Sequence, residues 1–512
     1  MWNSIIDTVT AVNDWLNGIV WGWPVIILIL GTGLWLSIRT GFLQLSHFGE
    51  SLGTTIVPTI KSIGKKKTNG DKGISQFEAF SAAISGTVGT GNIVGVVAAI
   101  LTGGPGAVLW MWISAFFGMV TNYSENVLGL YYRKKENNAG EFSGGAFYYI
   151  ENGLKSWKWL SKFLAYFAAA VSMLAAVGLS GVQTNKISGT LSESLGAAFG
   201  VETGSPAETL VKLLIGIIIA IIAAVIIIGG IKRIGKVASK LIPFMSLLFM
   251  VLALIAIFSH VSAVPAAFSL IFRTAFNFTA VGGGVLGYVF ATTIKKGMAR
   301  GVFSNEAGLG SSVIAHSASE TREPVVQGLW GVFEVFFDTF VICTLTALMF
   351  LTTFADRLTA LDGSIDDAKM SIAMFQTNFG TFGVVCFCVI LPLFAFTTIM
   401  AWSYYGEKAT GFCFKWVKSE KVRGGIVLGF KILYIFFIVA AAVIGSDLVW
   451  DLSDTFNGMM AFPNLIALIA LSGTVAKISK NYFARKKGAK ITPMLSAYPE
   501  QNEEFIRDLE SK

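Results

Sequence analysis

Hydrophobic segments long enough to cross a bilayer recur along the whole chain. A transmembrane helix needs about 20 mainly apolar residues in a row. Strands of a membrane β-barrel would alternate apolar and polar residues, whereas stretches such as 213–229 are continuously apolar. The pattern predicts an all-α polytopic membrane protein with about eleven spans, at residues 17–38, 78–102, 106–132, 160–183, 208–230, 241–260, 278–295, 324–352, 382–406, 425–446 and 456–476.

The second of these spans is interrupted near its middle by the octet Ser85-Gly86-Thr87-Val88-Gly89-Thr90-Gly91-Asn92. Its three glycines and its asparagine weaken a continuous helix. Irregular backbone inside a bilayer is tolerated only where protein or a water-filled cavity covers it. The ends of such half-helices can hold an ion or a carboxylate. The octet therefore suggests the binding site of a transporter, and a glycine-rich packing face for a neighbouring helix is the alternative.

The ten spans after the first divide into two sets of five. The second set opens with another glycine-interrupted apolar segment at 278–287. Since five is odd, the second set starts from the opposite side of the membrane, which is the pattern of an inverted repeat. We expect an N-terminal helix with a basic segment, a first repeat, a second repeat and a charged, flexible tail, at 1–77, 78–277, 278–476 and 477–512 respectively.

Two of the connecting segments look structured. Residues 42–48 carry four large apolar side chains and predict a short interfacial helix, with a plain linker as the alternative. Residues 295–323 include a stretch rich in small residues, Phe303 to Ser312, which is not freely polar. We expect this segment to be ordered and packed under the bundle.

Composition supports a membrane protein and excludes other classes. Of the 512 residues 54% are hydrophobic and 14% charged, whereas soluble domains carry about a quarter charged residues. The four cysteines have no metal-ligand spacing, and the three histidines are widely separated. There is no zinc-protease motif, phosphate-binding loop or nucleophile elbow. The sequence therefore predicts neither an enzyme nor a bound cofactor.

The net charge of +8 reflects membrane orientation rather than nucleic-acid binding. With eleven spans the loops alternate sides, and Lys and Arg number 30 on one side and 4 on the other. Basic residues favour the cytoplasmic side. We expect a multi-pass protein of a bacterial-type plasma membrane with its N-terminus outside and its C-terminus in the cytoplasm. The lipid bilayer is then a partner, and no obligatory protein partner is evident.

The two interrupted segments supply the oxygen atoms and amides that a sodium ion and an amino acid need. Backbone carbonyls are hard ligands that bring no net charge, so we expect them, with the Asn92 side chain, to bind sodium. The amides of Thr90 and Gly91 can receive a substrate carboxylate. In the second segment Thr279 offers a hydroxyl, Phe278 a wall, and Gly282 and Gly283 a close backbone approach.

Polar side chains in three other spans are further candidates. Thr397 and Thr398 can ligate sodium, although membrane threonines more often bond to their own helix. Trp402, one turn after Thr398, can cap a small substrate or belong to an interfacial belt. Gln183 can bond to substrate or hold helices together.

Three acidic residues fall inside predicted spans. Glu334 and Asp338 are four residues apart and share a helix face, and Glu125 lies in another span. Such residues are functional candidates that can relay protons or hold a cation. We favour structural roles, with pairing to loop arginines such as Arg300 or Arg322. His316 reads as a packed loop residue.

Three stretches of the chain resemble the alanine/glycine:cation symporters, also called sodium:alanine symporters. They are Gly91-Asn92-Ile93-Val94-Gly95-Val96, residues 104–112 (GPGAVLWMW) and residues 303–311 (FSNEAGLGS). The resemblance covers nearly the whole chain. It implies a leucine-transporter-like fold of two inverted five-helix repeats plus an N-terminal helix. It also implies import of alanine or glycine with sodium by alternating access.

The resemblance also implies roles for individual residues. One cation site would comprise Asn92, Thr279 and the Thr87 carbonyl, beside the substrate carboxylate. A second would comprise the Ser85 and Val88 carbonyls with Thr397 and Thr398. Gln183 and Trp402 match positions that line the substrate pocket of the family. A glutamine carrier and a proton-coupled symporter of the same fold, using Glu334 or Asp338, remain alternatives.

Overall fold

The computed structural model describes residues 2–62, 74–135, 141–199, 201–202, 204–276, 285–354, 366–444 and 446–510. These parts are almost entirely helical, and their one sheet pairs β1 (Lys134–Lys135) with β2 (Phe142–Ser143) antiparallel. The longer helices are α1 (Trp2–Val20), α2 (Trp23–Thr40), α4 (Phe48–Ser62), α5 (Gln76–Thr87), α6 (Val94–Gly103), α7 (Ala107–Tyr131), α8 (Ala146–Gly153), α9 (Trp159–Phe199), α10 (Pro206–Ile227), α11 (Gly230–Ser259), α12 (Val264–Ala275), α13 (Val285–Asn305), α15 (Pro324–Val335), α16 (Thr344–Thr353), α17 (Asp367–Cys413), α18 (Glu420–Val443), α19 (Ser446–Lys486) and α20 (Pro499–Glu510).

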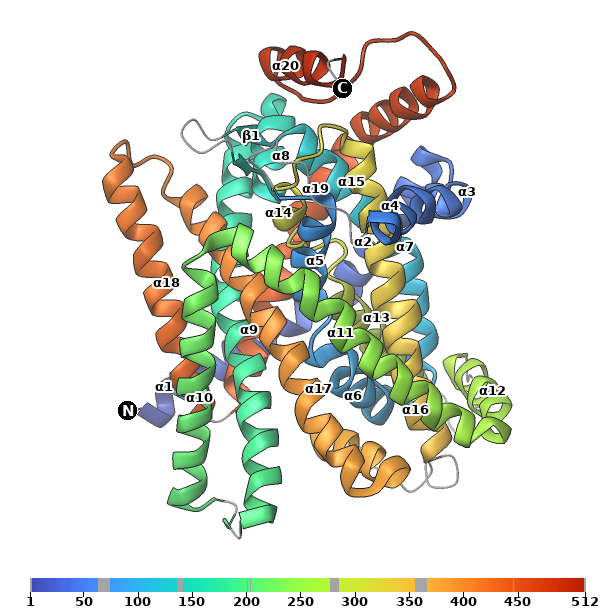
Figure 1. The fold of residues 1–512 in the computed structure, drawn as a ribbon, viewed down its shortest axis with the longest axis vertical. Helices are drawn as coiled ribbons and strands as arrows, with labels where there is room; N and C mark the ends of the chain where they lie inside the picture. Colours follow the sequence, from blue (N-terminus) through green and yellow to red (C-terminus); the bar gives the residue numbers. More distant parts are fainter. Residues whose placement is uncertain are drawn as a thin grey trace.

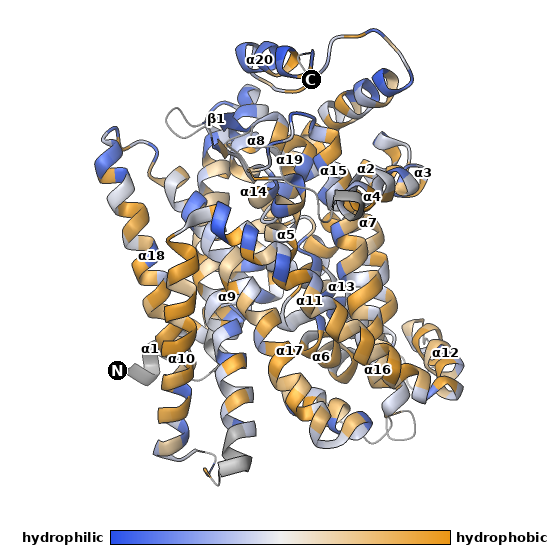
Figure 2. Ribbon diagram, viewed as in Figure 1, coloured by the Kyte–Doolittle hydropathy of each residue, from blue (hydrophilic) through white to orange (hydrophobic). Residues whose placement is uncertain are grey.

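Eight helical segments in the described parts are long and apolar enough to cross a membrane. They coincide with eight of the predicted spans. The other three predicted spans correspond to the broken pair α5–α6, to α7 and to α13, whose preceding residues 277–284 are not described. Figure 2 shows the outer helices α10 and α18 dominated by hydrophobic residues, as lipid-facing helices require.

The break between α5 and α6 lies near the middle of the bundle. Helix α5 begins with a capping box in which Ser75 and Glu78 bond to each other's backbone amides. It ends at Thr87, and a single 3₁₀ turn, η1 (Thr90–Asn92), leads into α6. Helix α5 packs against α11 and α17, and α6 packs against α13 and α17 (Figure 1). The predicted interruption of this span is therefore present, and protein covers the irregular backbone.

Several segments predicted as loops are helical, because hydropathy locates apolar length and not helix ends. A helix, α1, replaces the expected loop 1–16, and the chain turns at Trp21 and Gly22 before α2. Helix α9 continues to Phe199, and α12 occupies most of the expected loop 261–277. The expected loop 295–323 starts as the last part of α13, and residues 301–319 are all buried. Its predicted packing against the bundle is confirmed.

The segment after α2 is also helical, so the linker alternative is wrong. It forms α3 (Leu43–Ser46) and then α4. Leu43 is buried against the bundle, whereas Leu45 is exposed. Helix α4 lies against α15, where the Ser51 hydroxyl donates to the Leu329 carbonyl at 2.7 Å.

The expectation of a flexible tail after residue 477 is wrong for the described residues up to 510. Helix α19 continues to Lys486, and α20 folds back over the end of the bundle that carries β1 and α8 (Figure 1). The Phe505 ring is buried with Phe142, and Asp508 forms an ion pair with Arg322 at 3.1 Å. Hydropathy does not reveal this docking, because α20 is a charged helix and docks mainly through one buried ring, that of Phe505.

Candidate substrate and cation site

The side chain of Asn92 bridges the broken helix. Its Oδ1 accepts a hydrogen bond from the Gly89 amide at 2.8 Å, which closes the turn between the half-helices. Its Nδ2 donates to Asp338 Oδ1 at 2.6 Å and to Ser304 Oγ at 3.0 Å. The Thr346 hydroxyl donates to the Asn92 carbonyl at 2.8 Å. Asn92 therefore ties the break to α13 and to the π-helical segment η4 (Phe336–Cys343) that joins α15 to α16.

A cavity of about 10 Å³ lies at the break, roughly the space of one water molecule. Residues from α5, from the break itself and from α9, α13, α17 and α19 meet there. The cavity is lined by Gly86, Thr87, Gly89, Gly91, Leu179, Gln183, Phe303, Glu306, Thr398, Trp402 and Asn457. Three residues predicted to bind substrate, Gly91, Gln183 and Trp402, therefore share one small site with Thr87 and Thr398, which were predicted to bind sodium.

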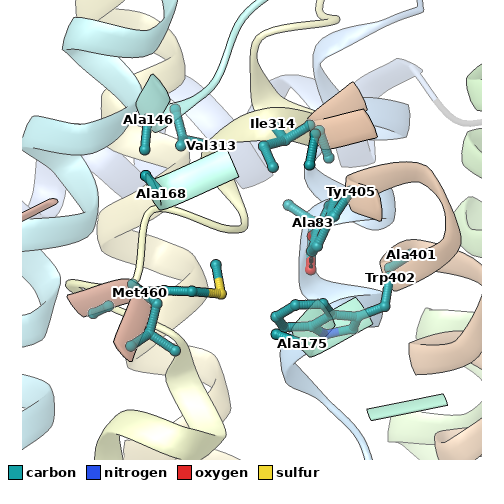
Figure 3. Close-up of a cluster of buried hydrophobic side chains, with 14 of the residues drawn as sticks. Ala83, Ala146, Ala168, Ala175, Val313, Ile314, Ala401, Trp402, Tyr405 and Met460 are labelled. Carbon is teal, nitrogen blue, oxygen red and sulfur yellow. Dashed lines mark hydrogen bonds between the residues drawn. The ribbon is translucent and has the colours of Figure 1, made fainter. Parts of the chain in front are cut away.

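Gln183 and Trp402 approach the break from two different helices. The Thr90 hydroxyl and amide donate to Gln183 Oε1 at 2.9 and 3.4 Å. Trp402 is fully buried, with its ring 5.3 Å from that of Tyr405, and the Tyr405 hydroxyl donates to the Ala83 carbonyl at 3.3 Å. Figure 3 shows these two rings beside Ala83. Trp402 is therefore an internal wall of the site and not an interfacial residue.

The glycines of the octet permit close approach of α17. A Cβ on Gly89 would lie 2.5 Å from Thr398 Oγ1, and one on Gly86 would lie 2.9 Å from the Tyr405 hydroxyl. Both distances are shorter than normal contacts, so larger residues would push α17 away. The octet thus also serves as a packing face, and the two interpretations of it are compatible.

The hydroxyls predicted to bind cations bond to their own helices in this structure. Thr397 and Thr398 both donate to the Phe394 carbonyl, at 2.8 and 3.2 Å. Thr398 lies against Gly89, whereas the Thr397 hydroxyl also approaches Met245 Sδ at 3.9 Å. The hydroxyl lone pairs are still able to face an ion. The other predicted residues of the octet, Ser85 and Val88, are fully buried at the end of α5.

Asp338 lies beside the predicted cation residue Asn92, which the sequence analysis did not foresee. Besides Asn92, its carboxylate accepts hydrogen bonds from the Ser304 hydroxyl at 2.8 Å and from the Thr339 hydroxyl at 2.9 Å. The carboxylate is fully buried. Together with the Ser304 hydroxyl it orients the Asn92 amide, and it places an ionisable group next to the break.

Glu334 and Glu125 have structural partners, but not the arginines expected. Glu334 Oε2 lies 2.7 Å from His316 Nε2, and both side chains are buried. Glu125 Oε1 accepts from the amides of Gly308 and Gly310, both at 3.0 Å. The predicted pairing with arginines is wrong.

Both arginines have other neighbours. Arg322 pairs with Asp508 in the tail, and the Arg300 guanidinium lies over the rings of Phe303 and Trp450. Glu334 and Asp338 have different hydrogen-bond partners, and η4 begins between them.

Two polar residues of the cavity were missed by the sequence analysis. Glu306 follows α13 with a left-handed φ of 55°, and its carboxylate accepts from Trp402 Nε1 at 2.9 Å and from the Ser311 hydroxyl at 2.6 Å. Asn457 comes from α19. The signal for Glu306 was an acid within a stretch of small residues, and nothing in the local sequence distinguished Asn457. The predicted residues Phe278, Thr279, Gly282 and Gly283 lie outside the described residues.

A helix broken at a buried polar cavity, within a bundle of apolar helices, defines a membrane transporter rather than an enzyme. The profile of the sodium:alanine symporter family matches residues 6–496. The chain belongs to this family, as the resemblance of its motifs implied.

Characterised and uncharacterised relatives cover nearly the whole chain. It is 38% identical over 489 residues to the sodium/alanine symporter AgcS of Methanococcus maripaludis, covering 95% of this chain and all of that protein. It is 34% identical to the probable sodium/glutamine symporter GlnT of Bacillus subtilis, covering 93% and 91%. An uncharacterized transporter of Haemophilus influenzae is 38% identical, covering 94% and 97%.

Solved structures with a similar fold are more distant in sequence. The transporter MhsT in complex with L-phenylalanine superimposes with a TM-score of 0.54 at 15% identity, over 80% of this chain and 99% of MhsT. A Na⁺-coupled sialic acid symporter gives 0.51 at 12% identity, over 94% and 93%. The predicted leucine-transporter-like fold is confirmed.

Proposed function

We propose that this protein imports small neutral amino acids, alanine or glycine, together with sodium by alternating access. The observation that carries the proposal is the enclosed cavity at the α5–α6 break, between Gln183 of α9 and Trp402 of α17. Because about 10 Å³ does not admit an amino acid, the surrounding helices have to separate for substrate to enter.

The proposed binding residues combine the cavity with the neighbouring backbone. The substrate carboxylate binds at the amides of the half-helix, where the helix dipole and free N–H groups favour an anion. We assign substrate binding to Thr87, Thr90, Gly91, Gln183, Phe278, Gly282, Gly283 and Trp402. We assign sodium binding to Ser85, Thr87, Val88, Asn92, Thr279, Thr397 and Thr398.

Sodium supplies the driving force in this scheme. One positive charge that moves inward through 100 mV releases about 2.3 kcal/mol, which supports about a 50-fold accumulation of a neutral solute. The proposal includes a bacterial plasma membrane, an external N-terminus and a cytoplasmic C-terminus, in accord with the 30-to-4 distribution of basic residues. It also divides the core into inverted repeats at 78–277 and 278–476.

The test is uptake of labelled alanine into proteoliposomes with an inward sodium gradient. Matched vesicles carry a potassium gradient instead, and unlabelled glycine and glutamine serve as competitors. We expect sodium-dependent uptake that glycine inhibits and glutamine does not. Equal uptake from sodium and potassium would refute sodium coupling.

Two alternatives each have one observation in their favour. The similarity to a probable sodium/glutamine symporter favours glutamine as substrate, and strong inhibition by glutamine in the same assay would support it. The buried Asp338 carboxylate next to Asn92 favours proton coupling. That alternative predicts uptake that persists without sodium and follows a pH gradient.

A further inference from the structure

Asn457 lines the cavity, and its side-chain oxygen has no hydrogen bond in the described parts of the chain. The side chain is 1% exposed, and the atom without a partner is Oδ1. A buried amide oxygen without a donor costs about 1–3 kcal/mol. At a residue that lines a binding cavity, a ligand is able to supply the missing donor.

Glu306 is the second acceptor in this part of the cavity. Among the described lining residues it alone has a charged side chain, and it is 2% exposed. Its two hydrogen bonds come from neutral groups, the Trp402 indole and the Ser311 hydroxyl. No basic side chain in the described ranges forms an ion pair with it. A buried carboxylate is costly unless a positive charge accompanies it.

Gln183 supplies a hydrogen-bond donor to the cavity. Because its Oε1 accepts from Thr90, its amide NH₂ is turned the other way. The Nε2 atom lies 3.5 Å from the position of a Cβ on Gly89, at the break itself. The cavity therefore has hydrogen-bond donors at the break and two acceptors. The acceptors are Asn457 from α19 and the Glu306 carboxylate, which follows α13.

We propose that Glu306 and Asn457 form an ammonium subsite that selects zwitterionic substrates. An ammonium group has three donors and one positive charge. It would satisfy the Asn457 oxygen and neutralise Glu306 while the substrate carboxylate faces Gln183 and the half-helix. This inference rests on the proposed function, since it assigns the second end of the same substrate.

The test compares two ligands of the same size, L-alanine and L-lactate. Lactate keeps the carboxylate and the methyl group but has a hydroxyl in place of the ammonium. Binding to purified protein in saturating sodium gives both affinities, with lactate measured by displacement of labelled alanine. We expect the wild type to favour alanine strongly. Glu306→Gln, which keeps the shape of the side chain, should weaken alanine binding about 10- to 150-fold and change lactate binding less than twofold.

A second variant and a control keep the result interpretable if Glu306→Gln folds poorly. Asn457→Ser removes the unpaired oxygen and should also reduce the preference for alanine over lactate. Glu125→Gln alters a buried carboxylate outside the cavity lining and should leave the ratio of the two affinities unchanged.

The inference is overturned if Glu306→Gln weakens both ligands equally, because Glu306 would then only hold Trp402 in place. Unaltered alanine binding by that variant would overturn it as well. Wild-type protein that shows no sodium-driven alanine uptake would refute the proposed function instead, so the two failures are distinguishable.

Discussion

Replacing Asp338 with asparagine tests whether the buried carboxylate next to the break maintains the sodium site. Asp338 accepts from Asn92, Ser304 and Thr339, and Asn92 in turn accepts from the Gly89 amide at 2.8 Å. An asparagine presents an NH₂ group to at least one of these donors. The Asn92 amide then loses its orientation, and with it the geometry of the backbone carbonyls around the break.

The size of the effect follows from the kind of bond that is lost. A hydrogen bond to a charged group contributes about 1.5–3 kcal/mol, so Asp338→Asn should raise the sodium concentration for half-maximal uptake about 10- to 150-fold. The control is Ser304→Ala, which removes one neutral donor from the same carboxylate at 2.8 Å. This variant leaves the carboxylate and its hydrogen bonds from Asn92 and Thr339 in place, so its effect on sodium activation should be smaller than that of Asp338→Asn.

The assay is alanine uptake into proteoliposomes as a function of external sodium, with equal amounts of folded protein. The thermal unfolding temperature with and without sodium provides a second readout that does not depend on transport. If Asp338→Asn shows wild-type sodium activation, or if Ser304→Ala is the more damaging change, the carboxylate does not organise the site.

Three further changes probe the helix break, the docked tail and a buried carboxylate. Gly89→Ala should abolish alanine binding and lower the unfolding temperature, because the new Cβ would lie 2.5 Å from Thr398 Oγ1. If the cause is steric, an added Thr398→Ala should restore the unfolding temperature. Wild-type binding by the single variant would contradict the prediction. Phe505→Ala removes a fully buried ring, which should cost about 3–5 kcal/mol of stability. Trypsin should therefore cut the segment 487–490 faster in this variant than in the control Ile491→Ala, which changes an exposed residue. Equal cleavage rates would show that this ring does not dock the tail. Glu125→Gln weakens two charge-assisted hydrogen bonds to backbone amides, so the unfolding temperature should fall. An unchanged unfolding temperature would show that these two bonds do not stabilise the fold.

Most of the fold could be predicted from the sequence because a bilayer imposes a strong constraint. Apolar runs of about 20 residues locate the spans, and the uneven distribution of Lys and Arg predicts their orientation. Helix ends were predicted less well, as α1, α9 and α12 show. Their extra turns are partly polar or amphipathic, so hydropathy does not distinguish them from loops.

The candidate site was predictable where residues unusual for a membrane helix interrupt an apolar span. Glycines inside an apolar run indicate a broken helix directly. Gln183 and Trp402 were candidates because they lie in apolar spans, and the family resemblance supported them. The partners of the buried acids were not predictable. Glu334 meets His316 and Asp338 meets Asn92 across helices that are distant in the sequence, and no local pattern encodes such contacts.

The sequence by itself determined that this chain spans a membrane many times, that one span is broken, and that the family is the sodium:alanine symporters. These properties depend on local composition and on short motifs, because membrane insertion and helix breaking are decided by neighbouring residues along the chain. Only the tertiary structure decided which polar groups share the cavity. Glu306 and Asn457 join Gln183 there because α9, α13, α17 and α19 converge on the break, and burial away from water forces each polar atom to find its partner in space rather than along the chain.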